Sequence, residues 1–248
     1  MFRPRVALAS LSGEADADWA RAVESHVGCA FLGGIALDGP TREAAREMVD
    51  RERSEFLPPD PVAFVDDQLA ALADAAVRPA FNVRSTALEP VERAARVCRD
   101  HDAILEVNAH CRQDEMCAAG AGESLLRDTD RLAEFVEAAV STGATVSVKG
   151  RAELEGVSLP EVAQVIESAG GDVFHVDAMD SESVVEAVVD ATDLFVVANN
   201  GIRGRETARE YLDYGADAVS VGRPSDNPEI LRAVRAATDE WFAEEPRP

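Results

Sequence analysis

Side chains suited to proton transfer and ligand binding stand together near the middle of the chain. An apolar run over residues 103–107 is followed directly by Asn108, His110 and Cys111, and a small-residue segment follows at Ala118–Gly122. This order predicts a buried strand with polar and nucleophilic side chains at its C-terminal end, then a glycine loop whose backbone can approach a ligand. The alternative is that Cys111 is a packed loop thiol and that the glycines only turn the chain.

Lys149 is the only lysine of the chain, although Lys and Arg together number 24. It stands near the end of the alternating segment TVSVKGR, which closes on Arg151. Arginine presents a rigid planar fork, whereas lysine presents a compact point charge whose pKa shifts readily on burial. The lone lysine therefore indicates a cation set against an electron-rich or anionic ligand atom, and the alternative is an accidental position.

Two glycine turns in the last quarter of the chain predict a phosphate site. The segment ANNGI contains Asn199, Asn200 and Gly201, and the segment VSVGR ends in Gly222 and Arg223. A helical pattern follows each turn, so backbone N–H groups and helix N-termini would surround one point. Two ordinary turns, in which glycine supplies a positive φ, are the alternative.

Strand and helix patterns alternate along the whole chain. Eight short apolar runs, each followed by residues of helical spacing, indicate parallel strands that are buried on both faces. Eight such units favour one (β/α)8 TIM barrel over residues 1–248, and the GxGxxG fingerprint of an open dinucleotide-binding sheet is missing. The expected strands are Val6–Ser10, Cys29–Leu32, Ala80–Val83, Ile104–Asn108, Thr145–Lys149, Asp172–Val176, Leu194–Ala198 and Ala218–Val221. Between the second and third strands we expect two helices, Thr41–Phe56 and Pro61–Ala76.

In such a barrel, functional side chains gather on the loops at the C-terminal ends of the strands. Besides the residues already named, Asn82 and Arg84 end the third strand, and His175 and Asp177 end the sixth. Random placement would distribute polar residues over both ends of the barrel, so their common position predicts a single ligand site.

Charge and cysteine content narrow the classes of function. The formal net charge is −23, from 47 acidic and 24 basic residues, and the acids are dispersed. Dispersed acid with almost no lysine is typical of proteins of extreme halophiles, and an acidic protein of a mesophile is the alternative. The charge repels nucleic acid at low salt, although molar salt shortens the Debye length to about 3 Å and screens that repulsion.

The four cysteines form no CxxC pair, so neither a disulfide framework nor a metal site is indicated. The sequence contains no long apolar segment and no apolar core of a signal peptide. We therefore expect a cytoplasmic protein with no membrane partner.

Several motifs together resemble the tRNA-dihydrouridine synthases, which are flavin-dependent TIM barrels of the wider dihydroorotate-dehydrogenase-like group. NAHC, GAGESLL, SVKGR, the strand-end His175, NNGI and GADAVSVGR follow in the order and spacing of that family, over residues 81–231. The pattern NxxC…GxGxxLL is the most specific part. The resemblance implies FMN across the barrel mouth, NADPH or NADH as electron donor, and reduction of the uracil C5=C6 bond by hydride from reduced FMN.

The resemblance also implies roles for single residues. Cys111 would be the catalytic acid that protonates the pyrimidine carbon, and Asn108 and Arg151 would bind the substrate. Lys149, His175 and Asn82 would contact the flavin ring system, with Asn82 where the family usually has a glutamine. The residues implied for the flavin phosphate are Asn199, Asn200, Gly201, Gly222 and Arg223.

Some segments depart from the family pattern. His110-Cys111-Arg112 stands where the family has Gly-Cys-Pro, and no counterpart of the family's helical tRNA-binding C-terminal domain is expected. Three classes of function stay open. They are a compact reductase of uridine in tRNA, helped by a separate RNA-binding partner, a flavin oxidoreductase of a free pyrimidine or other small molecule, and a non-redox barrel that binds another phosphate ligand.

Overall fold

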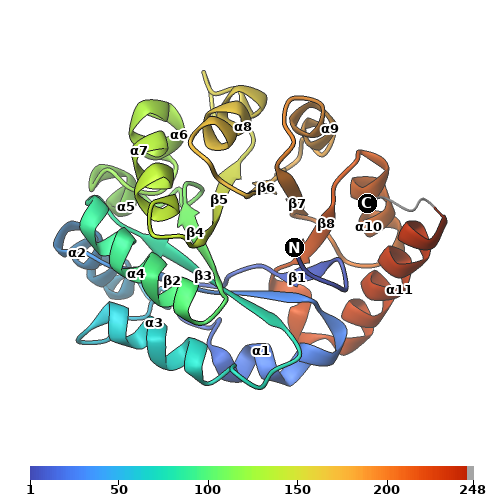
Figure 1. The fold of residues 1–248 in the computed structure, drawn as a ribbon, viewed down its shortest axis with the longest axis horizontal. Helices are drawn as coiled ribbons and strands as arrows, with labels where there is room; N and C mark the ends of the chain where they lie inside the picture. The colour runs from blue at the N-terminus through green and yellow to red at the C-terminus, as the bar shows by residue number, and fades with distance from the viewer. Residues whose placement is uncertain (245–248) are drawn as a thin grey trace.

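Eight parallel strands close into a barrel in sequence order in the computed structural model, which describes residues 1–244 (Figure 1). The closing pair is β1 with β8, where Leu8 stands in register with Val221. The strands are β1 Val6–Leu8, β2 Cys29–Ala36, β3 Arg78–Arg84, β4 Ile104–Asn108, β5 Thr145–Arg151, β6 Val173–Asp177, β7 Phe195–Asn199 and β8 Ala218–Val221. The prediction of a (β/α)8 TIM barrel is confirmed, and the predicted end of the domain at Pro248 lies outside the described residues.

Helices surround the barrel and pack on the outer faces of the strands (Figure 1). The helices of this layer are α1 Ala17–Val23, α3 Pro61–Ala70, α4 Leu88–Asp100, α7 Thr129–Val140, α8 Leu159–Ser168, α9 Val184–Val189, α10 Arg205–Asp213 and α11 Pro228–Glu244. Three further helices stand in the loops after β2 and β4: α2 Gly39–Asp50, α5 Asp114–Ala118 and α6 Ser124–Arg127. Short 3-10 turns follow α1 at Glu24–His26 and β8 at Arg223–Asp226.

The region between β2 and β3 differs from the sequence prediction. The helix expected over Thr41–Phe56 ends at Asp50, and Phe56 instead forms a bridge with Ile35 at the end of β2. The second helix ends at Ala70 rather than Ala76. Helical spacing of apolar residues continued past both helix ends, but Phe56 is held by the neighbouring strand, and tertiary pairing of this kind overrides local propensity.

β2 continues through Gly33 and Gly34, where the sequence indicated a stop. A register shift between Gly33 and Ile35 lets the strand pass close to β3. Gly33 has a φ of +89°, and a Cβ at this position would lie 2.6 Å from the carbonyl oxygen of Asn82. The glycines therefore permit a bulge and a close approach between two strands instead of ending one.

The interior of the barrel changes from apolar to polar along the strands. Alternate residues of a strand point to the same face, so β4 turns Ile104, Glu106 and Asn108 inward in succession. Apolar side chains form one cluster inside the barrel: Phe2, Ala7, Cys29, Phe31, Ala80, Ile104, Val173, Val197 and Ala218. Nearer the C-terminal ends, the buried polar side chains are Asn82, Glu106, Asn108, Ser147, Lys149, His175, Asn199 and Ser220. Burying so many polar groups requires internal partners, and these form the candidate site.

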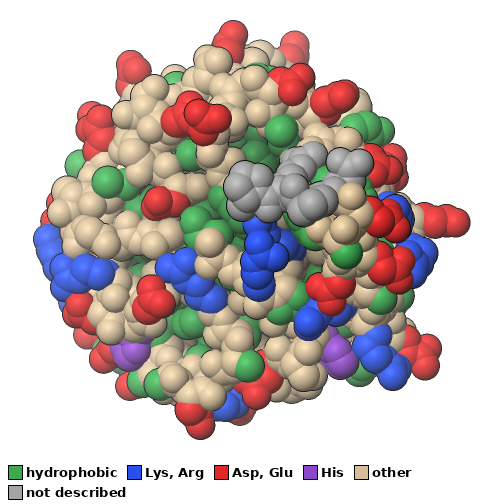
Figure 2. Space-filling view, turned by 45° about the vertical axis from the view of Figure 1, so that its right-hand side comes forward, with side chains coloured by type: hydrophobic (Ala, Val, Ile, Leu, Met, Phe, Trp, Pro, Cys, Tyr) green, Lys and Arg blue, Asp and Glu red, His purple; other side chains and the backbone are tan. Residues whose placement is uncertain are grey.

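On the face shown in Figure 2, acidic side chains are distributed widely and are not collected in one patch. Arginines commonly pair with them, as in the bonds of Arg205 to Glu240 and of Arg235 to Asp239. None of the helices in residues 1–244 has the length and the apolar character that a membrane crossing requires.

Asp38 joins the loop after β2 to the loop after β3. Its Oδ1 accepts from the backbone N–H of Thr41 and caps α2, and its Oδ2 accepts from Ser85 Oγ and from the N–H and Oγ1 of Thr86. Burial would raise the pKa of Asp38, but the hydrogen bonds from Thr41 and Thr86 more than offset it and the pKa is lowered.

We expect Asp38→Ala to lower the free energy of unfolding by about 2 kcal/mol or more, above the roughly 1 kcal/mol of an ordinary helix cap. Asp128→Ala is the control, because Asp128 caps α7 through one bond to Arg131 N–H. The folded-state pKa of Asp38 lies below the unfolded value of about 3.9. The stability that the Asp38 carboxylate contributes is therefore complete above the unfolded-state pKa and is lost as the pH falls through the folded-state pKa. Equal losses for the two variants in denaturant titrations at neutral pH would contradict this role.

Candidate functional site

The strand register places the predicted polar residues beside one another at the C-terminal rim, which here means the last residues of the strands and the loops that follow them. Asn108 of β4 stands beside Lys149 of β5, and Lys149 stands beside His175 of β6. Asp177 then stands beside Asn199 of β7. Because the strands are parallel and adjacent, residues that are far apart in the sequence meet at one end of the barrel.

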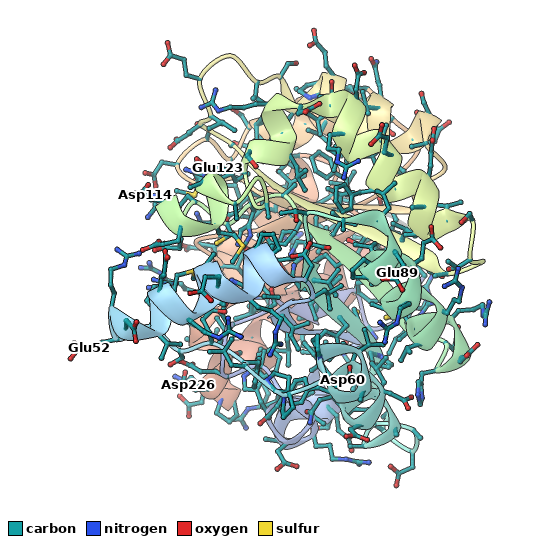
Figure 3. All side chains as sticks on the ribbon, turned by 90° about the vertical axis from the view of Figure 1, so that its left-hand side faces the viewer. Glu52, Asp60, Glu89, Asp114, Glu123 and Asp226 are labelled. Atoms are coloured by element: carbon teal, nitrogen blue, oxygen red, sulfur yellow. The ribbon has the colours of Figure 1, made fainter. Side chains whose placement is uncertain are left out.

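The loops after β2, β4 and β8 face the same end of the molecule. Figure 3 shows Glu52 after α2, Asp114 and Glu123 of the β4 loop, and Asp226 after β8 along one side. This side carries the C-terminal rim, and the three loops therefore surround the residues that end the strands.

Glu106 is a fully buried carboxylate in the polar level of the barrel, and the sequence analysis did not select it. Its Oε1 accepts from Asn82 Nδ2 at 2.7 Å, and its Oε2 accepts from Ser147 Oγ at 3.1 Å and contacts His175 Nδ1 at 2.8 Å. Burial would raise the pKa of Glu106, but His175, Lys149 and Asn82 more than offset this effect and the pKa is lowered. Glu106 is therefore an anion at neutral pH. An acid inside an apolar run was the sequence signal for it.

His175 uses both ring nitrogens inside the barrel. Nδ1 contacts Glu106 and Nε2 lies 2.7 Å from Ser220 Oγ, while the ring lies 4.7 Å from the ring of Phe31. Burial lowers the pKa of His175 despite the neighbouring carboxylate, so the ring is neutral at neutral pH. Because a carboxylate only accepts, Nδ1 carries the proton and Nε2 accepts from Ser220. Direct contact of His175 with a flavin stays a prediction.

Lys149 is only 2% exposed. Burial lowers the pKa of Lys149, and the charges of Glu106 and Asp177 act in the opposite direction. Within residues 1–244, no side chain or carbonyl forms a hydrogen bond or ion pair with its ammonium group. A buried cation without a direct partner is costly, so this position indicates a ligand that completes its environment.

Asn108 fixes the loop that carries Cys111. Its Oδ1 accepts from the backbone N–H of Cys111 at 3.0 Å and from that of His110 at 3.2 Å. Its Nδ2 donates to Asn82 Oδ1 at 2.8 Å, which leaves one amide hydrogen for another acceptor. The structure thus shows Asn108 as a loop anchor, and its predicted contact with substrate stays a prediction.

The glycine segment after Cys111 is required by close packing. Gly122 has a φ of +63°, and a Cβ there would lie 2.3 Å from the carbonyl oxygen of Cys111. The same carbonyl accepts from Glu123 N–H at 2.9 Å. Only glycine fits this approach, which returns the loop to the thiol.

Cys117 differs from Cys111 in its surroundings. Its thiol lies 3.5 Å from the carbonyl oxygen of Cys111 and donates to it. Burial, with the negative charge of Glu123, raises the pKa of Cys117 to about 11. Cys117 therefore holds its proton at neutral pH and supports the loop.

Two arginines at the rim are anchored by acids from the loops. Arg84 of β3 forms an ion pair with Glu55, and the two side chains are 1% and 0% exposed. Arg84 Nη2 also donates to the Gly34 carbonyl at 2.7 Å. Arg151 of β5 pairs with Glu123 at 2.6 Å. Glu55 could not be predicted as a partner from local sequence, because it lies 29 residues before Arg84.

Both anchored arginines keep one donor free. The Nε atoms of Arg84 and Arg151 are buried and have no hydrogen-bond partner in the described part of the chain. Burial would lower the pKa of Arg84, but Glu55 and, after it, the nearby Cys111 more than offset this effect and the pKa is raised. The two buried Nε–H groups and the Lys149 ammonium group therefore supply cationic donors that have no acceptor within residues 1–244. Such a donor set fits an electron-rich or anionic ligand.

The turns after β7 and β8 show some of the features expected of an anion-binding site. Asn200 and Gly201 have φ values of 96° and 66°. Arg223 is exposed and forms no side-chain bond within residues 1–244, and the buried Ser225 Oγ also has no partner there. The Asn199 amide instead donates to the Ser220 carbonyl at 3.0 Å and ties β7 to β8. Helices α10 and α11 begin at Arg205 and Pro228, several residues beyond Gly201 and Gly222, so the turns themselves would have to supply the donors.

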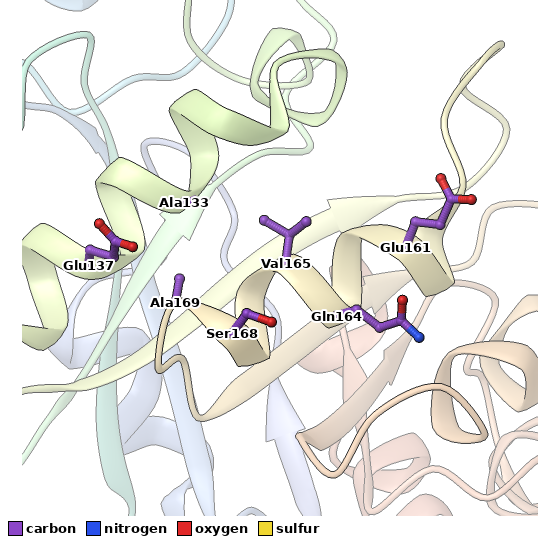
Figure 4. A pocket seen from close by; sticks show the side chains of 7 residues that line it. All are labelled: Ala133, Glu137, Glu161, Gln164, Val165, Ser168 and Ala169. Carbon is purple, nitrogen blue, oxygen red and sulfur yellow. The ribbon is translucent and has the colours of Figure 1, made fainter.

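A surface hollow of about 370 Å³ lies elsewhere, between α7 and α8 (Figure 4). Its lining residues include Glu137, Val165 and Ser168, and none of the predicted site residues. No cationic side chain lines this hollow, so it does not offer the donor set found at the rim.

Comparisons with known proteins match most of the chain. The family model described as Dihydrouridine synthase (Dus) matches residues 78–247, which is more than half of the chain. An uncharacterized protein of Methanocaldococcus jannaschii is 27% identical over 230 residues, covering 88% of each chain. tRNA-dihydrouridine synthase B of Xanthomonas campestris pv. campestris is 26% identical over 155 residues, covering 57% of this chain and 47% of that protein. The chain thus spans about half the length of the tRNA-dihydrouridine synthase that it matches.

Among solved structures, a variant of NCR from Zymomonas mobilis has a TM-score of 0.62 at 15% identity. The match covers 98% of this chain and 88% of that chain. At this level of identity it supports the barrel fold alone.

We expect Glu55→Gln to destabilise the fold by about 3–5 kcal/mol, because it leaves the Arg84 guanidinium buried without its counter-ion. The measurement is the free energy of unfolding in denaturant. Glu43→Gln is the matched control, since it breaks an exposed pair with Arg46 and exposed pairs contribute little. Indistinguishable unfolding curves for the two variants would show that the buried pair is not an anchor.

Proposed function

The chain belongs to the dihydrouridine synthase family, whose members are FMN-dependent oxidoreductases, and we propose that it binds FMN at the C-terminal rim and reduces the C5=C6 bond of uridine in tRNA. The observation that carries this proposal is Lys149, the single lysine of the chain, which is 2% exposed at the rim and has no direct partner within residues 1–244. A cation in this state suits the electron-rich edge of a flavin ring.

The rim residues also suit the other parts of FMN. The adjacent turns at Asn200-Gly201 and Gly222-Arg223 would hold the phosphate through backbone N–H groups, the free Arg223 guanidinium and the buried Ser225 hydroxyl. Asn82, which retains one amide hydrogen beyond its bond to Glu106, would contact the ring system. The unpaired donors described above are the structural reason that these residues fit the cofactor.

Reduced FMN would supply the hydride for C6 of the uracil ring. Cys111 would hold a proton on Sγ and deliver it to C5, which leaves a thiolate. Arg84 lies near this sulfur and would stabilise the anion, while Glu55 fixes the guanidinium. Asn108 holds the backbone of the loop, so the thiol is positioned before substrate arrives.

Arg151 is the predicted substrate contact on β5. Its Nη1 is held by Glu123, and its buried Nε–H has no acceptor in residues 1–244. A carbonyl oxygen of the pyrimidine would satisfy that donor. As negative charge develops on the ring during hydride addition, this bond would strengthen.

The choice of tRNA as substrate rests on the named relatives, of which the chain matches about half. A net charge of −23 weighs against unassisted RNA binding at low salt, so a separate RNA-binding partner and NADPH or NADH as reductant are part of the proposal, as is a cytoplasmic location. The same charge favours the second candidate, a flavin oxidoreductase of a free pyrimidine in the manner of dihydroorotate dehydrogenases.

Deletion of the gene distinguishes the two candidates. We expect loss of dihydrouridine from at least one tRNA position, measured by mass spectrometry of digested tRNA, with recovery by the wild-type gene and none by a Lys149→Met gene. Unchanged dihydrouridine content would contradict the tRNA activity. A purified chain that binds FMN and reduces a free pyrimidine would then favour the second candidate.

We expect Cys111→Ala to retain FMN but to lose turnover by about 10²–10⁴-fold, the range for one acid–base group. Cys117→Ala is the matched control from the same loop and should stay within a few-fold of wild type, because the Cys117 thiol supports the loop. Single-turnover rates of flavin oxidation by substrate measure the step. The reverse ranking of the two variants would refute the assignment of Cys111.

A further inference from the structure

The Glu106 carboxylate is held inside the barrel by hydrogen bonds. Its side chain is 0% exposed, and three groups from three other strands contact it: Asn82 of β3, Ser147 of β5 and His175 of β6. Asn82 and Ser147 are uncharged, and burial lowers the pKa of His175 despite the carboxylate beside it. The hydrogen bonds therefore stabilise the negative charge of Glu106 but do not cancel it.

Lys149 carries the opposite charge and lies nearer the C-terminal ends of the strands than Glu106. Ser147 and Lys149 point inward from β5 in succession, and Glu106 stands in register with Ser147. Lys149 stands in register with Asn108, the next inward residue of β4. The ammonium group and the carboxylate thus occupy diagonal positions on neighbouring strands, both inside the barrel.

Other charged groups surround Lys149 from each neighbouring element. Apart from Glu106 and Asp177, none of the other titratable side chains nearby within residues 1–244 supplies negative charge. Arg84 of β3 and Arg151 of β5 are cations, and burial lowers the pKa of both His110 and His175. Asp177 of β6 is the other acid that acts on Lys149. Asp177 is partly exposed, whereas Glu106 is fully buried, so solvent screens Asp177 more strongly.

We propose that Glu106 is the fixed counter-charge of Lys149: a buried carboxylate, held by Asn82, Ser147 and His175, that keeps the only lysine of the chain protonated at the rim. Glu106 is then a positioning residue, because it acts through Lys149 and touches no ligand. The inference rests on the proposed function for its purpose, since a flavin ring that gains negative charge on reduction requires a cation beside it.

The sequence offers an unusually direct test, because a single lysine gives a single side-chain signal. The chain is produced with 13C- and 15N-labelled lysine, and the Lys149 Cε and Nζ signals are followed by NMR against pH without FMN. We expect Glu106→Gln to move the Lys149 titration to lower pH, because it removes the negative charge and keeps the shape. Ser147→Ala is the matched control: it removes one hydrogen bond to the carboxylate but leaves the charge, and should move the titration far less.

Two results would overturn the proposal. One is an unchanged Lys149 titration in Glu106→Gln, and the other is a larger displacement in Asp177→Asn than in Glu106→Gln. A merely structural role of Glu106 would predict similar effects for Glu106→Gln and Ser147→Ala.

A double-mutant cycle keeps the proposal testable if Glu106→Gln is poorly folded. Glu106→Gln, Lys149→Met and the double variant are compared in their unfolding midpoints. We expect the double variant to be less destabilised than the sum of the single changes, because removal of both charges leaves neither uncompensated. Additive losses would overturn the pairing. Neither measurement uses flavin, so a chain that binds no FMN but shows the coupling would contradict the proposed function alone.

Discussion

A buried carboxylate must be satisfied inside the barrel, and the arrangement of the rim depends on how this is done. Glu106 accepts from Asn82, Asn82 accepts from Asn108, and Asn108 accepts from the backbone N–H of Cys111. A chain of hydrogen bonds therefore leads from the centre of the barrel to the backbone of Cys111. Since each amide is fixed at both ends, the loop after β4 is held in one conformation before a ligand binds.

The loops around the rim are fixed by arginines on the strand ends. Glu55 reaches Arg84 from the loop after β2, and Glu123 reaches Arg151 from the loop after β4. Each pair occupies part of a guanidinium and leaves its Nε–H without an acceptor in the described part of the chain. The same side chains thus anchor loops and retain donors for a ligand. Lys149, as a point charge without a planar fork, has no such anchoring bond within residues 1–244.

The fold was largely predictable because each strand reads as a short buried run. The prediction failed where distant contacts decide the conformation: Phe56 continues a helical pattern but is held by Ile35, and the Gly33-Gly34 pair permits a bulge against Asn82. The rim residues were found because strand ends in a barrel converge. The Glu106 carboxylate was missed because it was read as part of an apolar run, although one acid in such a run is itself a signal of a buried network. The ion pair between Glu55 and Arg84 could not be predicted from the sequence around either residue.

We propose that the C-terminal rim is a flavin site built around Lys149, and a crystal structure of the chain with FMN is the decisive test. We expect Lys149 Nζ within hydrogen-bond distance of the flavin ring, with the phosphate at the turns of Asn200-Gly201 and Gly222-Arg223 and Cys111 facing open space above the ring. A flavin bound away from the rim, or bound there with Lys149 turned from the ring, would refute the flavin site.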